Sequence, residues 1–226
     1  MKNRFYVDAD LAAGAIVALN DDERHHARVL RVRDGEEVEV FNGRGASFLA
    51  TFETVDIIRL LSRTADREAR TAIHLAMSII PIDKFELVLQ KATELGVRSI
   101  VPLITARTEV RPERYRGKEE RWRKIVFEAT KQSGRAIIPA IEPVTPFQDI
   151  VARAGTKIIF DADAEPSTTR HPDNPTTLLI GPEGGWSEEE LRTARERGCL
   201  FQQLGPRRLR AETAAIVATA MIAVRI

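Results

Sequence analysis

Hydrophobic and polar residues alternate with a period of two over much of the first 70 residues. Val38 and Val40, for example, alternate with glutamates, as in a strand that buries one face. Asn42 and Gly43 form a dipeptide typical of a tight hairpin turn. We expect strands at residues 4–7, 15–19, 36–41, 47–55 and 57–61, and one short helix at 21–32. Short strands at this spacing predict a small β-barrel or sandwich.

The hydrophobic period changes after residue 70 to one typical of helices. Residues 84–95 carry an apolar stripe with helical spacing, which Gly96 ends. The polar segment 64–70 lacks any apolar period and is the expected linker. Strands are expected at 73–80, 99–104, 157–160, 177–180 and 199–204, and helices at 84–95, 119–132, 188–197 and 212–224. This alternation predicts an α/β domain at 71–226 with a parallel sheet covered on both faces, after a β domain at 1–70.

Charge is nearly balanced over the whole chain of 226 residues, which has a net charge of +1. A protein that binds polyanions through its overall charge is therefore excluded, although a local basic face is not. Residues 107–135 hold ten basic and five acidic side chains, a local charge of +5. This segment is either a solvated helix face with i,i+4 ion pairs or a surface that follows RNA phosphates.

The single cysteine excludes an intrachain disulfide framework and fits a reducing, cytoplasmic compartment. No apolar segment follows the basic start of the chain, so we expect no signal peptide. The most apolar segment, 214–224, is too short for a membrane span. The four histidines and Cys199 have no metal-ligand spacing, so we expect no metal site, and we expect Cys199 to be a packed thiol.

A glycine-rich segment, Gly181 to Ser187, follows the strand expected at 177–180. Ser187 and Glu190 have the spacing of a helix capping box. Glycines let the backbone approach a flat ligand closely, and open α/β sheets bind ligands at the carboxyl ends of their strands. The spacing is that of neither a P-loop nor G-x-G-x-x-G, so ATP is not indicated. An ordinary strand–turn–helix connection is the alternative.

A second Gly-Pro segment, 204–214, joins the last expected strand to the last helix. It has three arginines within residues 207–210. Guanidinium groups are costly to desolvate there unless they meet an anion or a carboxylate. The alternative is a capping loop whose arginines pair with Glu183 or Glu212. We expect the two Gly-Pro loops to converge on one cleft, because they lie at adjacent strand ends.

The two segments, LLIGPEGGWSEEE and LGPRRLRAETAA, resemble the signature of the RsmE family of 16S rRNA uridine methyltransferases, which belongs to the SPOUT superfamily. The likeness extends to DKFELVLQKATELGV, RWRKIVFEATKQSGRAIIP, HHARVLRV and VFNGRG, and so covers nearly the whole chain. Lys131 departs from the pattern, since the family usually has an acidic residue before Gln-x-x-Arg. The resemblance implies an α/β methyltransferase domain with a trefoil knot, preceded by a small PUA-like β-barrel domain that binds RNA.

The resemblance also implies S-adenosylmethionine as methyl donor and N3 of one uridine in 16S rRNA as acceptor (position 1498 in the usual rRNA numbering). The family is expected to act as a homodimer on the assembled small ribosomal subunit. A sulfonium donor already carries an activated methyl group, so the enzyme needs no metal or covalent nucleophile. It must align N3 with the methyl group and exclude water.

The resemblance assigns roles to residues of both loops. Arg210 is the first catalytic candidate and Arg207 the second, because an arginine stabilises charge on the uracil oxygens without losing a proton. Glu183 and Glu212 could orient these arginines, or one of them could act as base. The expected cofactor-binding residues are Ile180, Gly181, Glu183, Gly184, Gly185, Leu204, Gly205, Leu209, Arg210, Thr213 and Ala214. Phe160 and Asp161 are expected beside the ribose.

RNA contacts are expected from two regions. The candidates are His26, Arg28 and Arg31 on the short amino-terminal helix, and Lys91, Gln132 and Arg135 beside the expected cleft. Structured RNA is recognised largely through its shape, phosphates and 2′-hydroxyls. Trp122 and Trp186 could stack on the target base, but a tryptophan on a helix is expected to face the core, Trp122 above all.

Two alternatives remain open from the sequence. One is a non-catalytic RNA-binding protein whose glycine loops are only structural. The other is a SPOUT-type methyltransferase that acts on another RNA.

Overall fold

The computed structural model describes residues 2–164 and 174–223. It divides into two compact units, Met1–Glu68 with Thr130–Ile138, and Ala69–Ala129 with Pro139–Ile226. The segment 130–138 therefore makes its contacts within the first unit, although it lies far beyond residue 70 in the sequence. The expected end of the last helix, residue 224, lies outside the described residues.

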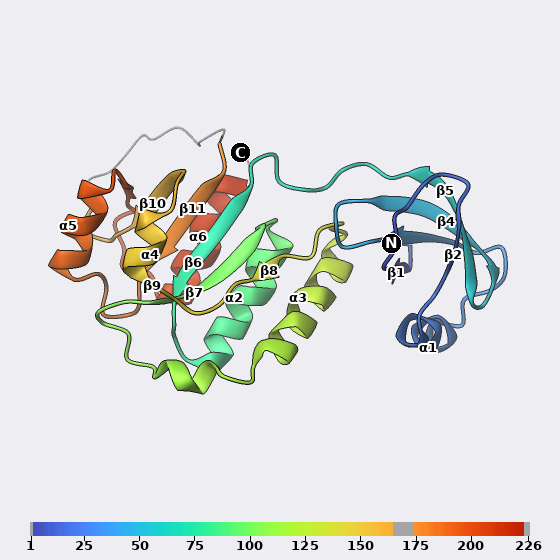
Figure 1. Ribbon diagram of the computed structural model, residues 1–226, viewed down its shortest axis with the longest axis horizontal. Coiled ribbons are helices and arrows are strands. Elements are labelled where there is room, and N and C mark those ends of the chain that lie inside the picture. The colour runs from blue at the N-terminus through green and yellow to red at the C-terminus, as the bar shows by residue number, and fades with distance from the viewer. Residues whose placement is uncertain (1, 165–173, 224–226) are drawn as a thin grey trace. The chain divides into compact units, whose positions relative to one another are not determined.

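The first unit contains a five-stranded sheet with the order β1-β3-β4-β5-β2 (Figure 1). Its elements are β1 (Arg4–Tyr6), β2 (Ile16–Ala18), α1 (Asp21–Leu30), β3 (Glu37–Phe41), β4 (Ser47–Thr54) and β5 (Ile57–Arg63). β1 pairs with β3 in parallel, and the other pairs are antiparallel. The expected strands are confirmed to within two residues at each end. The period-two pattern places Val38, Phe52 and Leu60 in the core.

Local signals define the boundaries of α1. The side chain of Asn20 caps its first turn by accepting a hydrogen bond from the backbone N–H of Glu23. Arg31 adopts the left-handed conformation, with φ of 55°, and ends the helix two residues before the expected position.

At the hairpin between β3 and β4, Gly43 has φ of +71°, a conformation that favours glycine.

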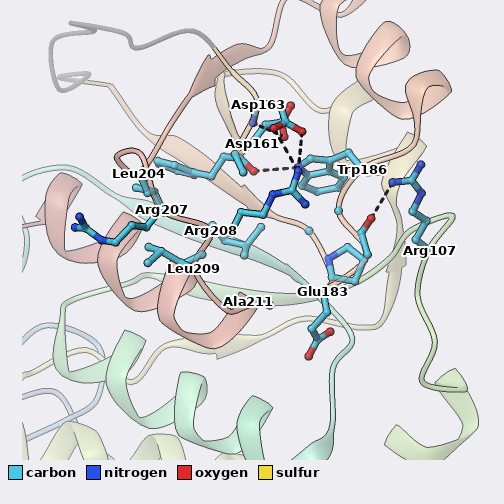
Figure 2. Close-up of a pocket in the computed structure, with 18 of the residues that line it drawn as sticks. Arg107, Asp161, Asp163, Glu183, Trp186, Leu204, Arg207, Arg208, Leu209 and Ala211 are labelled. Carbon is cyan, nitrogen blue, oxygen red and sulfur yellow. Dashed lines mark hydrogen bonds and ion pairs between the residues drawn. The ribbon is translucent and has the colours of Figure 1, made fainter.

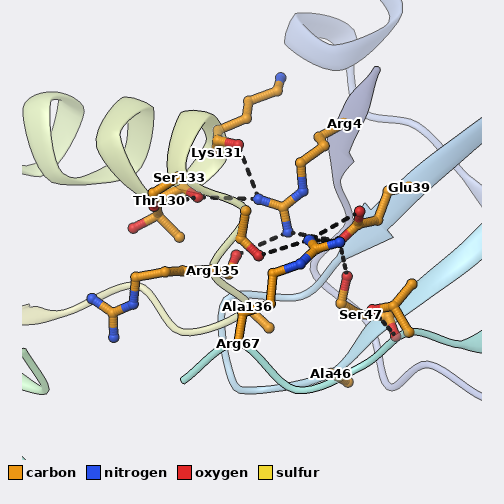
Figure 3. Close-up of polar contacts among 12 residues, drawn as sticks. Arg4, Glu39, Ala46, Ser47, Arg67, Thr130, Lys131, Ser133, Arg135 and Ala136 are labelled. Atoms are coloured by element: carbon orange, nitrogen blue, oxygen red, sulfur yellow. Dashed lines mark hydrogen bonds and ion pairs between the residues drawn. The ribbon is translucent and has the colours of Figure 1, made fainter. Parts of the chain in front are cut away.

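Buried arginines hold the segment 130–138 within the first unit (Figure 3). The guanidinium of Arg4 donates to the carbonyl oxygens of Thr130 at 3.1 Å, Lys131 at 2.9 Å and Arg135 at 2.9 Å. Arg135 in turn forms an ion pair with Glu68, at 2.6 Å. Thr130 and Lys131 lie in the last turn of the helix at 119–133 and Arg135 follows it, where backbone oxygens lack intrahelical partners, so the guanidinium acts as a cap.

The second unit contains a parallel sheet with the order β12-β10-β11-β6-β7-β8, and β9 also pairs with β7 (Figure 1). Its strands are β6 (Ile73–Ser78), β7 (Ser99–Ile104), β8 (Ala140–Ile141), β9 (Thr145–Pro146), β10 (Thr156–Phe160), β11 (Thr176–Ile180) and β12 (Leu200–Gln202). Every pairing among them is parallel. The expected α/β fold with a parallel sheet is confirmed.

Helices cover both faces of this sheet. They are α2 (Ile82–Glu94), α3 (Glu119–Ser133), α4 (Phe147–Ala152), α5 (Glu188–Glu196) and α6 (Ala211–Ala223), with a short 3-10 helix η1 (Pro112–Tyr115). Alternate residues of the strands pack with α4 and α5 in one core cluster. α6 packs against β6, β11 and α2. The strands are therefore apolar on both faces, as parallel strands between helices are.

Candidate cofactor and catalytic site

A cavity of about 280 Å³ lies at the carboxyl ends of β10, β11 and β12 (Figure 2). Three strand-end segments line it, together with Arg107 from the loop after β7. Its lining residues are Arg107, Phe160, Asp161, Ala162, Asp163, Ile180, Gly181, Pro182, Glu183, Gly184, Gly185, Trp186, Leu191, Leu204, Gly205, Arg207, Arg208, Leu209, Ala211 and Ala214. The two Gly-Pro loops of the sequence converge on one cavity, as expected, although the strands before them, β11 and β12, are not adjacent, because β10 lies between them.

Trp186 fixes the shape of the glycine-rich loop. Its indole N–H donates to the carbonyl oxygen of Phe160 at 3.0 Å, and the ring packs against Phe147. A Cβ at Gly181 would lie 3.1 Å from this ring, so the absence of a side chain makes room for the indole. Trp186 is only 6% exposed, and this burial leaves little of the ring open to stack on a base.

The predicted capping box is confirmed at the start of α5. Ser187 Oγ accepts from the backbone N–H of Glu190 at 3.2 Å, and the Glu190 carboxylate accepts from the backbone N–H of Ser187 at 2.8 Å. The second carboxylate oxygen of Glu190 accepts from the backbone N–H of Ala106 at 2.8 Å. One buried carboxylate therefore joins the glycine-rich loop to the loop after β7.

The arginines of the segment 204–214 do not form the pairs that the alternative, a capping loop, predicts. Arg208 forms an ion pair with Asp163 at 3.2 Å, rather than with Glu183 or Glu212. Both side chains of this pair are exposed, so it is screened by solvent. Arg207 and Arg210 are exposed, and no salt bridge holds either of them within residues 2–164 and 174–223. Their charges are available to a ligand.

Glu212 lies at the start of α6, outside the cavity lining, and is buried. One carboxylate oxygen is 3.8 Å from the Lys84 ammonium on α2. The other oxygen is buried and has no hydrogen-bond partner in the described part of the chain. A buried carboxylate oxygen without a donor is costly, and such a group points to an absent partner.

Tyr115, the last residue of η1, is buried in the second unit. Its hydroxyl donates to the carbonyl oxygen of Ile80 at 2.7 Å and accepts from the backbone N–H of Ile80 at 3.2 Å. Burial raises the pKa of Tyr115 above its usual range, so this hydroxyl stays protonated. Its ring packs edge-on against Trp122, which is 2% exposed, and the prediction that Trp122 faces the core is confirmed.

Two family models match this chain. The model described as RNA methyltransferase domain matches residues 67–223, and the model described as RNA methyltransferase PUA domain matches residues 19–60. The ribosomal RNA small subunit methyltransferase E of Rickettsia conorii is 31% identical over 97% of this chain and 94% of the relative. The chain belongs to the RsmE family of RNA methyltransferases. The enzyme of the same name from Aquifex aeolicus is 31% identical over 90% of this chain and 92% of its own.

Solved structures of family members have the same fold. The ribosomal RNA small subunit methyltransferase E of Neisseria gonorrhoeae, bound to S-adenosylmethionine, is 35% identical, with a TM-score of 0.86 and coverage of 97% of this chain and 96% of that one. A methyltransferase from Legionella pneumophila, also with bound S-adenosylmethionine, is 34% identical, with a TM-score of 0.80 over 98% of this chain and 97% of that one. The resemblance identified from the sequence is therefore confirmed.

The cavity of this RsmE family member brings together most of the residues expected at the cofactor. The expected residues that line it are Ile180, Gly181, Glu183, Gly184, Gly185, Leu204, Gly205, Leu209 and Ala214, with the catalytic candidate Arg207 and the ribose candidates Phe160 and Asp161. Arg210, Thr213 and Glu212 lie outside the lining. Their assignments, like those of the lining residues, remain predictions.

The residues expected to contact RNA have different environments. Arg28, Arg31 and Gln132 are exposed, and Lys91 binds Glu94 at 2.9 Å. His26 is half-buried, with its ring 5.5 Å from that of Phe5. Arg135 is only 3% exposed, and its guanidinium is bound to Glu68, so it is placed inside the protein rather than on its surface.

Sequence reasoning overlooked two charged residues of the cavity, Arg107 and Asp163. Arg107 is the first residue of the basic segment 107–135, and the sequence does not distinguish it from the other basic residues there. In the structure, a hydrogen bond of 2.9 Å from the backbone N–H of Thr105 to Thr108 Oγ1 holds its loop at the cavity. Asp163 follows β10 without any motif around it. Both follow strands whose carboxyl ends meet at the cavity, and this position was the available signal.

Cys199 is a free, buried thiol, and burial raises its pKa, as expected of a packed cysteine. In the described residues, no group of three or more His, Cys, Asp and Glu side chains is arranged to hold a metal ion. No helix within 2–164 and 174–223 combines the length and the apolar character that crossing a membrane requires.

Proposed function

We propose that this protein transfers a methyl group from S-adenosylmethionine to N3 of a uridine in the 16S rRNA of the small ribosomal subunit, at position 1498 in the usual rRNA numbering. The observation that carries this proposal is the cavity at the strand ends, lined by both motif loops of the family. Relatives named ribosomal RNA small subunit methyltransferase E match nearly the whole chain. Two related structures have S-adenosylmethionine bound.

The residues of the cavity fit the cofactor. Ile180, Leu204 and Leu209 offer apolar surface for an adenine ring, and Asp161 offers a carboxylate for ribose hydroxyls. Gly205 has φ of +84°, which lets the backbone turn beside the ligand. S-adenosylmethionine supplies, when bound, a methyl group already activated by the sulfonium.

The protein's own groups then act on the uracil. Arg210 and Arg207 stabilise negative charge on the uracil oxygens, and because they stay protonated they do so without a proton transfer of their own. Glu212 accepts the N3 proton, because its second carboxylate oxygen has no hydrogen-bond partner in the described residues. The loops align N3 with the methyl group, which is most of what in-line transfer requires.

The remaining parts of the proposal concern assembly. Apart from Glu212 and two threonines, α6 is apolar on every side, and Ile216, Val217 and Met221 remain partly exposed after it packs on β6, β11 and α2. A helix that is apolar all round belongs in a buried position. We propose that a second copy covers it, that the segment from residue 204 onward forms the trefoil knot, and that the dimer works in the cytoplasm.

The test is methyl transfer in vitro from labelled S-adenosylmethionine to small subunits purified from a strain that lacks this protein. Wild-type protein should place label in 16S rRNA, and an Arg210→Ala variant should place far less. Absence of label from a protein that still binds S-adenosylmethionine would favour the alternative of a related methyltransferase that acts on another RNA. Absence of both label and cofactor binding would favour a non-catalytic RNA-binding protein.

A further inference from the structure

Arg107 lies at the rim of the cavity with part of its hydrogen-bonding capacity unused. Its Nη1 donates to the carbonyl oxygen of Gly184 at 2.8 Å (Figure 2). A Cβ at Gly184 would lie 3.3 Å from Cβ of Arg107, so the arginine side chain lies directly against the bare face of the glycine. A guanidinium has five N–H donors, and in the described residues no carboxylate forms an ion pair with this one.

The loop that carries Arg107 is held on both sides. The backbone N–H of Ala106 donates to Glu190, which is 8% exposed, and the backbone N–H of Thr105 donates to Thr108 Oγ1 at 2.9 Å. Thr108 Oγ1 also lies 3.2 Å from Ser78 Oγ. The guanidinium is therefore positioned before any ligand arrives, which lowers the entropic cost of binding an anion.

The cavity has two chemically different sides. In the view of Figure 2, Leu204 and Leu209 lie on one side and Arg107 on the other. An adenine ring is flat and suits the apolar side, whereas the methionine part of S-adenosylmethionine ends in a carboxylate. Arginine binds carboxylates through paired hydrogen bonds.

We propose that Arg107 binds the α-carboxylate of S-adenosylmethionine and that Glu190 positions Arg107 for this contact. The inference rests on the proposed function, because it takes that molecule as the cofactor. A phosphate of the RNA is the other anion that a guanidinium at the rim could meet. The carboxylate fits better, because the hydrogen bond to Gly184 holds Arg107 against the loop that lines the cofactor cavity.

Two ligands separate the carboxylate from the rest of the cofactor. S-adenosylhomocysteine keeps the amino-acid part, and 5′-methylthioadenosine lacks it. Calorimetry with Arg107→Ala should show a loss of affinity for S-adenosylhomocysteine of about tenfold to a hundredfold, the range for a hydrogen-bonded charge. Affinity for 5′-methylthioadenosine should change less than about threefold. Arg192→Ala, an exposed arginine of α5 whose side chain is 68% exposed, is the matched control and should change neither affinity.

Glu190→Gln tests the positioning role. A glutamine offers one acceptor oxygen where two backbone N–H groups now bind, so the loop after β7 should lose its anchor. The affinity ratio of the two ligands should shift in the same direction as in Arg107→Ala, but by a smaller factor. A defect in folding alone would weaken both ligands alike. Glu189→Gln, on the same helix with a side chain 82% exposed, is the control.

Three results would overturn the proposal. Equal weakening of both ligands by Arg107→Ala would mean that Arg107 acts only through the shape of the glycine loop. Unchanged binding of both ligands, with weaker RNA binding, would assign the guanidinium to an RNA phosphate. Wild-type protein that binds neither ligand would remove the proposed function together with this inference, whereas the first two results leave the proposed function intact.

Discussion

Gly181 and Trp186 share one space at the cofactor cavity. A Cβ built on Gly181 would lie 3.1 Å from Cε2 of the indole, and the indole cannot withdraw because its N–H is bound to the carbonyl oxygen of Phe160. Glycine is therefore required at position 181 by packing. At Gly184 the nearest atom to such a Cβ is instead Cβ of Arg107, at 3.3 Å.

This contrast predicts different effects for the same substitution at the two glycines. Gly181→Ala should displace the indole and destabilise the loop by about 1–3 kcal/mol, with at least tenfold weaker binding of S-adenosylhomocysteine. Gly184→Ala should have a smaller effect, because its closest contact, Cβ of Arg107, is 3.3 Å away rather than 3.1 Å and is a single methylene rather than a ring. Calorimetry measures the affinities, and tryptophan fluorescence reports the displaced ring. Equal losses for the two variants would contradict this account of the loop.

Arg210→Ala should leave cofactor binding unchanged, since Arg210 is exposed and lies outside the cavity lining. Turnover should fall by about a hundredfold to a thousandfold, the loss typical of removing one preorganised donor to a developing negative charge. Single-turnover methyl transfer, with calorimetry on the same preparation, separates the two effects. Arg192→Ala is the control. A variant with normal turnover would exclude Arg210 from the transition state.

Replacing Arg4 should strongly destabilise the first unit. Arg4 is 5% exposed, caps three carbonyl oxygens and lies 3.2 Å from Glu39. Arg4→Met removes this donor from the carbonyl oxygens and one of the two guanidinium groups that bind Glu39, which keeps Arg67, and should lower the free energy of unfolding by about 2–4 kcal/mol. Lys2→Met, which removes an exposed pair with Glu37, should change it by less than about 1 kcal/mol. Urea denaturation compares the two, and similar losses would refute the role of Arg4.

Lys131 stands where the family usually has an acid, and its environment explains how this chain accommodates it. Its ammonium binds both carboxylate oxygens of Glu23 at 2.8 Å, and the Glu23 side chain is 5% exposed. Lys131→Glu should destabilise the first unit by about 3–5 kcal/mol, because two carboxylates would face each other. Adding Glu23→Lys should restore much of that stability. A double variant no more stable than the single one would show that the pair is not coupled.

The lowered pKa of His74 should make the free energy of unfolding depend on pH. Burial lowers its pKa below the ordinary value of 6.5. Because the Ser99 hydroxyl donates to Glu142 at 2.6 Å, Nδ1 of His74 must be the donor to Ser99 Oγ, at 2.8 Å. As the pH falls from about 7 to about 5, the unfolded chain takes up the proton first, so stability should fall in this window.

His74→Gln removes this titration and should flatten the pH dependence of the free energy of unfolding between about pH 5 and 7, whereas the exposed His25→Gln should not. Glu142 affects the free energy of unfolding at lower pH. Burial alone would raise its pKa, but hydrogen bonds from Ser99 and Arg153 outweigh burial and lower it. Its contribution to stability is thus lost only as the pH falls below its ordinary value of 4.5. Identical slopes for wild type and His74→Gln would contradict the prediction.

The sequence predicts elements whose signals are local, and it is silent on contacts between distant residues. The longer strands and helices are recovered because periodicity and caps such as Ser187 with Glu190 act over a few residues, whereas the two-residue strands β8 and β9 carry no such signal. α4 has six residues, too few for a helical period to stand out, and was not predicted. No local pattern reveals that Glu190 also binds Ala106, 84 residues away.

The same reason explains why the candidate site is only partly predictable. The glycines and arginines of the two motif loops indicate a binding site from the sequence alone. The burial of Arg135 depends on Glu68, 67 residues away, so its charge looks like an RNA contact in the sequence. For Arg107 the reverse holds: its charge looks like part of the basic segment in the sequence, but the sheet, in which β7 pairs with β6 and β6 with β11, brings the loop after β7 to the cavity.

The most direct test of the proposed reaction is the nucleoside composition of 16S rRNA in cells with and without this protein. Mass spectrometry of digested 16S rRNA should find 3-methyluridine in the parent strain and none in the deletion strain. The wild-type gene should restore it, and the Arg210→Ala gene should not. An unchanged level of 3-methyluridine in the deletion strain would contradict the account.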